Sequence, residues 1–542
     1  MKAPFVSAIP SRFPSIDADR LAARLGEDTE VALVDVREEG VQARDGHIIF
    51  SVPLPLSRLE LRAGTLLKRR GVPVVVTDGG PGDLAERAAQ KLAELGFVDV
   101  SVLAGGVAAW AGSGREVYTG SGAYSKAFGE FVEHAYGTPH ISAQEFKARR
   151  DAGERIVVLD GRTLQEFENF SLPGAHAVPN AELPLRAHDL IESPDDLVVV
   201  NCAGRTRSII GAQALINAGL PNKVVALENG TMAWLANGWN LEHGRKVELQ
   251  APSSAAIAQA KLAVERLSHR FNLSWIDEAA LAGFRSEADQ RSLYVYDVRS
   301  RAEFEAGHLP SAHWAEGGQL VQGIDRYIGA RNARLVVVDD EVGVRAAITA
   351  SWLVQLGWGE VHALAVRQTG DGRVTGPDQP PLLRDAPVAE AVAPAALKAE
   401  LDAGSVTVID LDTSLAYAAG HIPGAKFAVR ARLDAARGLG DDARIVLTSP
   451  DGILAAFAAT ELSANAGRPV RVLAGGTNAW RASGLALESG EAALLHATDD
   501  VWRSPYQQAG DRLAAFQAYL DWELGLLEQI RRDPTVSFKA VP

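Results

Sequence analysis

One pattern occurs four times along the 542-residue chain, and this repeat limits the possible folds more than any other feature of the sequence. In each copy an apolar run typical of a strand ends in an acidic residue: Asp35 in VALVDVR, Asp160 in IVVLDGR, Asp297 in LYVYDVR and Asp410 in VTVIDLD. Successive copies lie roughly 110 to 140 residues apart, which is the size of a whole domain and too long for a solenoid repeat. The chain is therefore expected to consist of four similar domains.

The four copies also continue alike. A segment similar to GHIPGA comes next, and a second apolar strand then ends at Asp78, Cys202, Asp340 or Ser449. An alanine-rich helical pattern and a short strand follow, and three copies add a turn and a helix containing Trp, whereas the third copy is degenerate in HALAVRQTG. Strands that alternate with helices through short connections predict an α/β fold. Each domain is expected to have a mainly parallel central sheet with helices on both faces.

Joints that contain Gly, Pro and Ser separate the copies. They divide the chain into five segments, which we call domains 1 to 4 and the tail: 1–118, 119–249, 250–375, 376–490 and 491–542. Helical patterns in 125–137 and 256–272 predict linker helices before domains 2 and 3. In 511–533, apolar residues recur at spacings of three and four, which predicts a helix that packs back on a domain.

The chain's single cysteine, Cys202, lies in the stretch VVVNCAGRTRS. An apolar strand leads into it and a short polar loop leads from it into a helical pattern, so Cys202 is placed where a strand passes into a helix. The unpaired N–H groups at a helix start, together with Arg205 and Arg207, favour an anion at this position. We therefore expect Cys202 to be largely thiolate at neutral pH and to act as a nucleophile. The alternative is a buried structural cysteine, which is common for this residue type.

Composition excludes several classes of function. Lys plus Arg number 54 and Asp plus Glu 68, and the resulting formal charge of −14 argues against nucleic acid or an anionic membrane as a partner. No stretch of the sequence is long and apolar enough for a membrane span, and no metal-ligand, dinucleotide-binding or P-loop motif is present. One cysteine cannot form an intramolecular disulfide, so we expect a cytoplasmic protein with neither cofactor nor metal.

The DxR strand ends, the GHIPGA-like segments, the CAGRTRS loop and the GG-xx-AW helix together resemble the rhodanese family. The resemblance covers nearly the whole chain as four tandem rhodanese-like domains, and it is closest to the members that act as thiosulfate sulfurtransferases. Only domain 2 has the cysteine, so the resemblance implies that domains 1, 3 and 4 are inactive. Domains 1 and 2 are similar to the tandem pairs of this family in which an inactive domain precedes an active one.

The resemblance implies a reaction in which Cys202 takes the sulfane sulfur of thiosulfate as a persulfide and passes it to an acceptor. The substrate-binding residues are expected in the loop that follows: Ala203, Gly204, Arg205, Thr206, Arg207 and Ser208. Backbone N–H groups there would hold the charged sulfur, and the two arginines would hold the dianionic donor. Asp160 and Arg162 are expected to support the loop, although similar acidic strand ends in the cysteine-less domains favour a role in the fold.

Other functions fit parts of the sequence. A cysteine-loop phosphatase or arsenate reductase resembles C-x5-R, whereas Cys202 to Arg207 is C-x4-R. A 3-mercaptopyruvate sulfurtransferase resembles the chain but has a less basic loop, CGSGVT. A sulfur-relay or scaffold protein for a protein partner would suit the three altered domains. The acceptor is left open among cyanide, glutathione and a protein thiol, and both a monomer and a homodimer remain possible.

Overall fold

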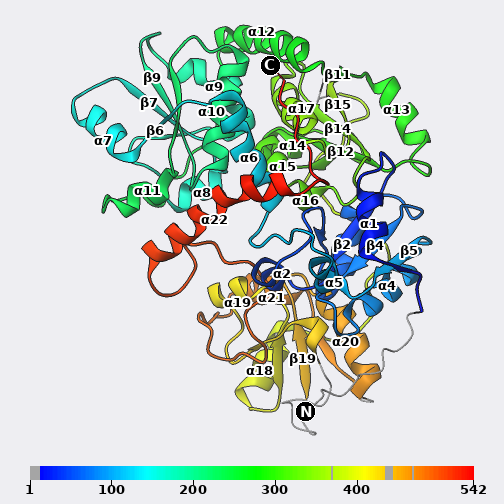
Figure 1. Ribbon diagram of the computed structural model, residues 1–542. Helices are drawn as coiled ribbons and strands as arrows, with labels where there is room; N and C mark the ends of the chain where they lie inside the picture. Colours follow the sequence, from blue (N-terminus) through cyan, green and yellow to red (C-terminus); the bar gives the residue numbers. More distant parts are fainter. Residues whose placement is uncertain (1–11, 368–369, 434–443, 467–468, 542) are drawn as a thin grey trace, which may run out of the picture.

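The computed structural model describes residues 12–367, 370–433, 444–466 and 469–541. These residues form four five-stranded sheets flanked by helices, and the paired strands run parallel in each sheet (Figure 1). All four sheets have the same strand order, for example β1-β5-β4-β2-β3 in domain 1. The predicted fold class, four tandem α/β domains, is confirmed.

Domains 1 and 2 share one sequence of elements, and domain 2 adds the linker helix α6 at its start. The elements of domain 1 are β1 (Ser15–Ile16), α1 (Ala18–Leu25), β2 (Ala32–Asp35), α2 (Glu39–Asp45), β3 (Val52–Pro53), the 3-10 helix η1 (Leu56–Arg58), α3 (Leu59–Leu66), β4 (Val74–Thr77), α4 (Leu84–Glu94), β5 (Val100–Leu103) and α5 (Gly106–Gly112). Those of domain 2 are α6 (Ala123–Tyr136), β6 (His140–Ile141), α7 (Ala143–Asp151), β7 (Ile156–Asp160), α8 (Leu164–Asn169), β8 (His176–Ala177), the 3-10 helix η2 (Asn180–Glu182), α9 (Leu183–Leu190), β9 (Leu197–Asn201), α10 (Thr206–Ala218), β10 (Val224–Leu227) and α11 (Gly230–Ala236).

Domains 3 and 4 repeat the arrangement, and one long helix follows them. The elements of domain 3 are α12 (Ser254–Phe271), β11 (Ser274–Trp275), α13 (Glu278–Ser286), β12 (Leu293–Asp297), α14 (Arg301–Ala306), β13 (His313–Trp314), α15 (Gly317–Gln322), α16 (Ile324–Tyr327), β14 (Arg334–Asp339), α17 (Val344–Leu356) and β15 (Glu360–Ala365). Those of domain 4 and the tail are β16 (Ala391–Val392), α18 (Pro394–Asp402), β17 (Thr407–Asp410), α19 (Ser414–Ala419), β18 (Lys426–Phe427), the 3-10 helix η3 (Arg430–Arg432), β19 (Ile445–Thr448), α20 (Ile453–Ala466), β20 (Arg471–Leu473), α21 (Gly476–Ala482) and α22 (Arg512–Arg532).

The inner strands are continuous apolar runs because helices cover both faces of each sheet. Strands β4, β9 and β19 are buried along their whole length. The chain leaves each of them at the carboxyl edge of the sheet and turns into a helix, which is the edge where ligands of open α/β sheets bind. Cys202 follows β9 at this edge.

The Trp-containing helices share one contact that explains their recurrence. In α5, α11 and α21 the indole N–H of Trp110, Trp234 or Trp480 donates to a backbone carbonyl six residues further along the chain. Domain 3 has no helix in the described part of 366–393. The described residues after β15 therefore contain no counterpart of this helix, in line with the degenerate sequence HALAVRQTG.

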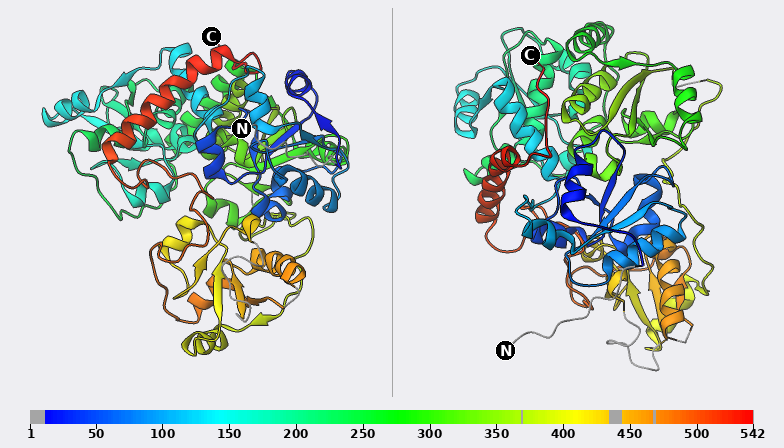
Figure 2. Two further views of the ribbon diagram at one scale, coloured as in Figure 1. Left: turned by 60° about the horizontal axis from the view of Figure 1, so that its bottom comes forward. Right: turned by 45° about the vertical axis from the view of Figure 1, so that its right-hand side comes forward.

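Domain 2 packs most extensively on domain 3, although the sequence suggested a pair with domain 1. Helices α9, α10 and η2 contact α12, α15 and α17, and Arg345 of domain 3 forms a buried ion pair of 3.0 Å with Glu182 of domain 2. Domain 1 pairs with domain 4 in a similar way, through the 2.7 Å ion pair of Arg430 with Glu60. Figure 2 shows these two pairs from further directions.

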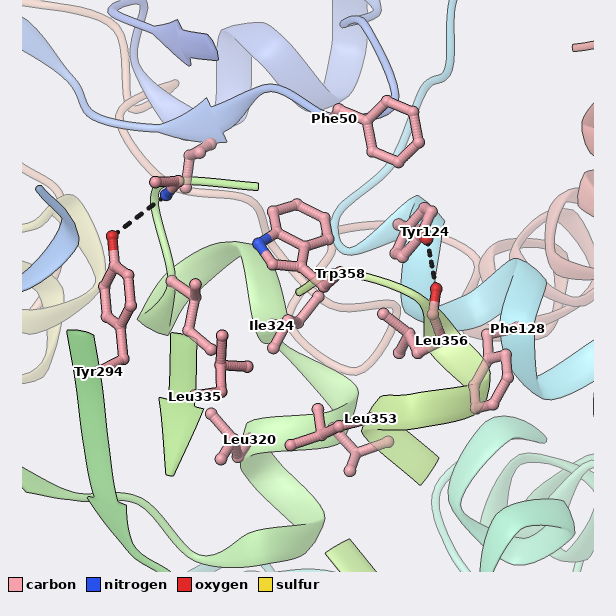
Figure 3. Close-up of a cluster of buried hydrophobic side chains, with 14 of the residues drawn as sticks. Phe50, Tyr124, Phe128, Tyr294, Leu320, Ile324, Leu335, Leu353, Leu356 and Trp358 are labelled. Carbon is pink, nitrogen blue, oxygen red and sulfur yellow. Dashed lines mark hydrogen bonds between the residues drawn. The ribbon is translucent and has the colours of Figure 1, made fainter. Parts of the chain in front are cut away.

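An aromatic cluster joins domain 1, the linker helix α6 and domain 3 (Figure 3). Phe50 of domain 1 and Tyr124 of α6 pack against the buried ring of Trp358, at centroid distances of 6.0 and 5.3 Å. The Tyr124 hydroxyl also donates to the carbonyl of Leu356 at 2.6 Å. This cluster fixes α6 from one side, while α10 and α22 pack on it elsewhere. Helix α22 therefore lies beside domain 2, as the red helix in Figure 2 shows.

Candidate active site

Cys202 lies in the loop between β9 and α10, and its side chain is almost wholly enclosed. It is a free cysteine with 2% of its surface exposed. The loop ends where α10 begins at Thr206, so the unpaired N–H groups of the first helical turn lie next to it. The sequence-predicted loop residues are thus together at the carboxyl edge of the domain 2 sheet.

The residues at the position of Cys202 in domains 1 and 4 show which backbone hydrogen-bond donors surround a side chain at this position. In domain 1, Asp78 accepts hydrogen bonds from the backbone N–H groups of Gly80, at 2.8 Å, and Ala85, at 3.1 Å. In domain 4, Ser449 accepts one from Ala455 N–H at 3.2 Å. The loop and the first turn of the helix that follows it therefore direct backbone donors at an acceptor atom in the position that Cys202 occupies in domain 2.

Helix α11 supports the loop from below by a close backbone approach. Thr231 N–H donates to the carbonyl of Cys202 at 2.9 Å. Gly230 has a φ of +49°, and a Cβ on it would overlap that same carbonyl. Gly106 and Gly476 are placed in the same way below Asp78 and Ser449. The second small residue of the GG-xx-AW motif is therefore glycine because a side chain would push this helix off the loop.

Arg205 is buried and holds the linker helix α6 against the loop. Its Nε and Nη2 donate to Glu130 at 2.7 and 2.9 Å, Nη2 also reaches Glu133 at 2.5 Å, and Nη1 reaches Asn229 at 3.3 Å. All three guanidinium nitrogens are thus engaged by protein groups. The contact with an anionic donor that the sequence suggested for Arg205 stays a prediction.

Arg207 forms a bidentate ion pair with Glu166, at 2.6 and 2.7 Å. Burial alone would raise the pKa of Glu166, but the Arg207 guanidinium lowers it to about 2. The same pair recurs in domain 3, where Arg345 contacts Glu303 at 2.9 Å. Because domain 3 has no cysteine, the recurrence favours a role of Arg207 in shaping the loop, and donor binding by Arg207 also stays a prediction.

Asp160 and Arg162 form a second recurrent pair below the loop. Their side chains are 2.7 Å apart and fully buried, and Arg162 Nη2 also donates to the carbonyl of Phe170 at 2.7 Å. The same strand-end pair occurs as Asp35–Arg37 and Asp297–Arg299 in domains without cysteine. This agrees with the interpretation that the pair supports the fold.

The remaining loop residues contact the backbone or the tail. Ser208 Oγ donates to the carbonyl of Arg205 at 2.7 Å, in the first turn of α10. The carbonyl of Ala203 accepts a bond from the Tyr506 hydroxyl at 3.3 Å. Gly204 faces α22, since a Cβ on it would lie 3.3 Å from the ring of Tyr519.

Sequence reasoning missed the residues that α6 and the tail bring to the site. Glu130 and Glu133 come from α6, and Tyr506, Tyr519 and Glu523 come from the tail. The sequence held one signal for the contact made by the tail. The buried stripe of α22 is apolar at helical spacing except at Glu523, and a carboxylate at a buried position needs a polar partner elsewhere in the fold.

The described residues contain no group of three or more His, Cys, Asp and Glu side chains placed to hold a metal ion. Within the same part of the chain, no helix has the length and apolar character needed to cross a membrane.

Comparisons with known proteins agree with the repeated architecture. The chain resembles a thiosulfate sulfurtransferase from Pseudomonas aeruginosa, with 43% sequence identity and a TM-score of 0.92 over 98% of this chain and 100% of that one. A putative sulfur carrier protein, YrkF, of Bacillus subtilis (strain 168) is 31% identical over 134 residues, which are 23% of this chain and 71% of the relative. An uncharacterized protein, YibN, of Escherichia coli (strain K12) is 36% identical over 100 residues, 18% of this chain and 68% of the relative.

The family model of the rhodanese-like domain matches the chain in four places, one in each sheet-forming unit: 17–113, 142–237, 281–365 and 393–483. Together with the four identical sheet orders, these matches show that the chain belongs to the family of rhodanese-like domain proteins.

Proposed function

We propose that the protein is a thiosulfate sulfurtransferase that carries the transferred sulfur as a persulfide on Cys202. The observation that carries this proposal is the direction of the backbone donors in the loop and in the first turn of the helix after it. Asp78 and Ser449 accept backbone hydrogen bonds at the position equivalent to Cys202, so the same loop in domain 2 suits an anionic sulfur. The resemblance to the P. aeruginosa thiosulfate sulfurtransferase along 98% of the chain supports thiosulfate as the donor.

The first half-reaction transfers the outer sulfur of the donor. The Cys202 thiolate attacks the sulfane sulfur of thiosulfate, a new S–S bond forms on Cys202, and the old S–S bond breaks as sulfite leaves with its electron pair. In the second half-reaction a nucleophile attacks the outer persulfide sulfur and releases the Cys202 thiolate. With cyanide the product is thiocyanate, and with a thiol it is a persulfide of that thiol.

The negative charge of the persulfide must be stabilised by hydrogen-bond donors of the protein. The N–H groups of the loop and of the first turn of α10 are preorganised donors of this kind, except for the Thr206 N–H, which donates to Glu523, and they act by the physics that stabilises an oxyanion. The N-terminal end of α10 adds a partial positive charge, because this helix is long and begins directly at the loop. These donors stabilise the charge on the outer sulfur as this atom bonds to Cys202, and they thereby favour transfer of the sulfur from the donor.

The enclosure of Cys202 limits the size of the molecule that can accept the sulfur. Cys202 is only 2% exposed beneath α22 and the Tyr506 segment, so a small acceptor such as cyanide or a thiol that reaches through an opened cover is favoured. The single cysteine of the chain and its need to remain reduced suit the cytoplasm.

The test is the intact mass of the protein after treatment with thiosulfate and desalting, measured again after cyanide is added. We expect one added sulfur on the peptide that contains Cys202, and its loss with release of thiocyanate. Cys202→Ser is the control and should gain no sulfur, because an unactivated hydroxyl is a poor nucleophile. No adduct on a thiol that is still reduced and open to alkylation would overturn the proposal, and rapid turnover of phosphate esters would favour the phosphatase alternative.

A further inference from the structure

The positive charges on the arginines around Cys202 are already compensated. Arg162 is paired with Asp160 at 2.7 Å, Arg205 with Glu130 at 2.7 Å, and Arg207 with Glu166 at 2.6 Å. A second anion at any of these guanidinium groups would have to compete with a carboxylate at contact distance. A dianionic donor therefore needs a cation that has no such partner.

Helix α6 carries such a cation, Lys126, on the face that contacts the Cys202 loop. Three of its residues form a stripe that contacts the loop: a Cβ at Gly129 would lie 2.8 Å from Thr206, and Glu130 and Glu133 hold Arg205. Lys126 precedes Gly129 by three residues and Glu130 by four. It therefore begins the same face of α6, one turn closer to the helix N-terminus.

Lys126 has a distinct electrostatic setting. Among the described residues its ammonium group has no hydrogen-bond or ion-pair partner, and the residue is only partly exposed. Burial lowers its pKa, and the charges that act on it are those of Glu523, Arg207, Cys202 and Glu166. A partly desolvated ammonium group on the face of α6 that contacts the Cys202 loop, without a contacting carboxylate, gains most from a bound anion.

We propose that Lys126 binds the oxygen atoms of the anionic sulfur donor, where α6 packs against the Cys202 loop. The ammonium donates hydrogen bonds to the sulfonate-like end of thiosulfate and to the sulfite that leaves. The assignment of thiosulfate rests on the proposed function, whereas the anion site itself rests on α6. The linker helix is thereby part of the binding site of domain 2, and the donor specificity depends on a residue that precedes the domain's sheet.

Steady-state kinetics test the role in donor binding. Lys126→Met should raise the KM for thiosulfate about 10-fold to 100-fold, the range expected for a lost charge-assisted hydrogen bond, with little change in kcat. Lys126→Arg should recover most of the loss. The increase should be smaller for benzenethiosulfonate, which carries one negative charge less. Lys398→Met, on the exposed face of α18 where Lys398 is paired with Asp402, is the matched control and should leave the KM unchanged.

A second experiment does not depend on the reaction. The rates at which iodoacetate and iodoacetamide alkylate Cys202 are compared, because the two reagents differ in charge and any change in thiolate content cancels in their ratio. Lys126→Met should lower the iodoacetate to iodoacetamide ratio several-fold, and Lys398→Met should not. Lys126→Gln serves if the Met variant does not fold.

The outcomes separate the two proposals. An unchanged ratio in a folded Lys126 variant would overturn the anion site, whatever the enzyme's activity. A lowered ratio in a protein that never accepts sulfur from thiosulfate would leave the anion site in place and remove thiosulfate as its ligand.

Discussion

Glu523 and Thr206 are joined by hydrogen bonds across 317 residues of sequence. One carboxylate oxygen of Glu523 accepts the Thr206 backbone N–H at 3.3 Å and also the Thr206 hydroxyl. Glu523 is fully buried. Helix α22 thus closes the loop of Cys202 by a charged contact at the first turn of α10.

Loss of this contact should uncover Cys202. In Glu523→Ala we expect N-ethylmaleimide to modify Cys202 about 10-fold faster than in the wild type, since a hydrogen bond to a charged group contributes about 1.5–3 kcal/mol to the closed state. The modification rate is followed by mass spectrometry. Glu528→Ala removes an exposed carboxylate of the same helix that is paired with Arg531 and is the control. Equal rates in the Glu523 and Glu528 variants would mean that α22 does not limit access.

The close approach of α11 predicts a severe effect at Gly230. Gly230→Ala should abolish most sulfur transfer and lower the Tm, because the added Cβ would overlap the Cys202 carbonyl and displace the loop. Gly238→Ala is the matched control. Gly238 also has a positive φ, +78°, but a Cβ there meets no atom within 4 Å. It bears only the conformational cost of about 1–2 kcal/mol, and a loss of activity equal to that of Gly230→Ala would contradict the explanation.

Arg205 is expected to matter for stability more than for donor capture. Arg205→Ala leaves Glu130 buried without its partner, and breaking a buried pair in this way costs about 3–5 kcal/mol. The double variant Arg205→Ala, Glu130→Gln should recover part of the loss in Tm, because no unpaired charge remains at that position. If Arg205→Ala keeps the wild-type Tm and raises only the KM for thiosulfate, the donor-binding role suggested by the sequence is correct.

We expect the ionisation of Asp410 to lower the stability of domain 4 as the pH rises. This residue ends β17 and is 1% exposed, and Asp412 stands where the other domains have the paired arginine. Burial raises the pKa of Asp410 to about 7, above the value near 3.9 of an unfolded chain. The folded state therefore holds the proton more tightly, so stability falls as the pH rises from about 4 to about 7 and stays low above it.

Asp410→Asn should remove this loss of stability at high pH. At about pH 8 the variant should be more stable than the wild type by up to about 4 kcal/mol, and at about pH 4 the difference should vanish. Scanning calorimetry at both pH values measures it. Asp402→Asn, at an exposed position paired with Lys398, should show no such pH dependence. A constant difference at Asp410 between the two pH values would contradict the prediction.

The fold class was predictable because its signals are local and repeated. Apolar strands, acidic strand ends and Trp-containing helices recur in order, and each element depends mainly on its own neighbours in sequence. The described residues after β15 lack the Trp-containing helix, and the degenerate sequence HALAVRQTG indicated this for the same reason. The pairing of domain 2 with domain 3 was not predictable, because it depends on contacts such as Arg345–Glu182 between segments far apart in the chain.

The site was only partly predictable. The position of Cys202 between a strand and a helix was predictable from the sequence, but the partners of Arg205 lie 72 and 75 residues earlier, on α6. Charge near the cysteine therefore suggested two free arginines where the fold supplies compensated ones. The recurrence of Arg207–Glu166 as Arg345–Glu303 was present in the aligned repeats, and comparing the copies residue by residue was the signal that could have revealed its structural character.

The order of synthesis gives the Thr206–Glu523 contact another meaning. The ribosome makes the Cys202 loop first, then two further domains, and only afterwards the helix that carries Glu523. Throughout that interval the Cys202 sulfur belongs to a domain whose sheet-forming residues have all been made, whereas the helix that covers the loop has not. The nascent chain thus displays a thiol that the finished protein conceals, and protection from oxidants in this interval depends on the surroundings of the ribosome.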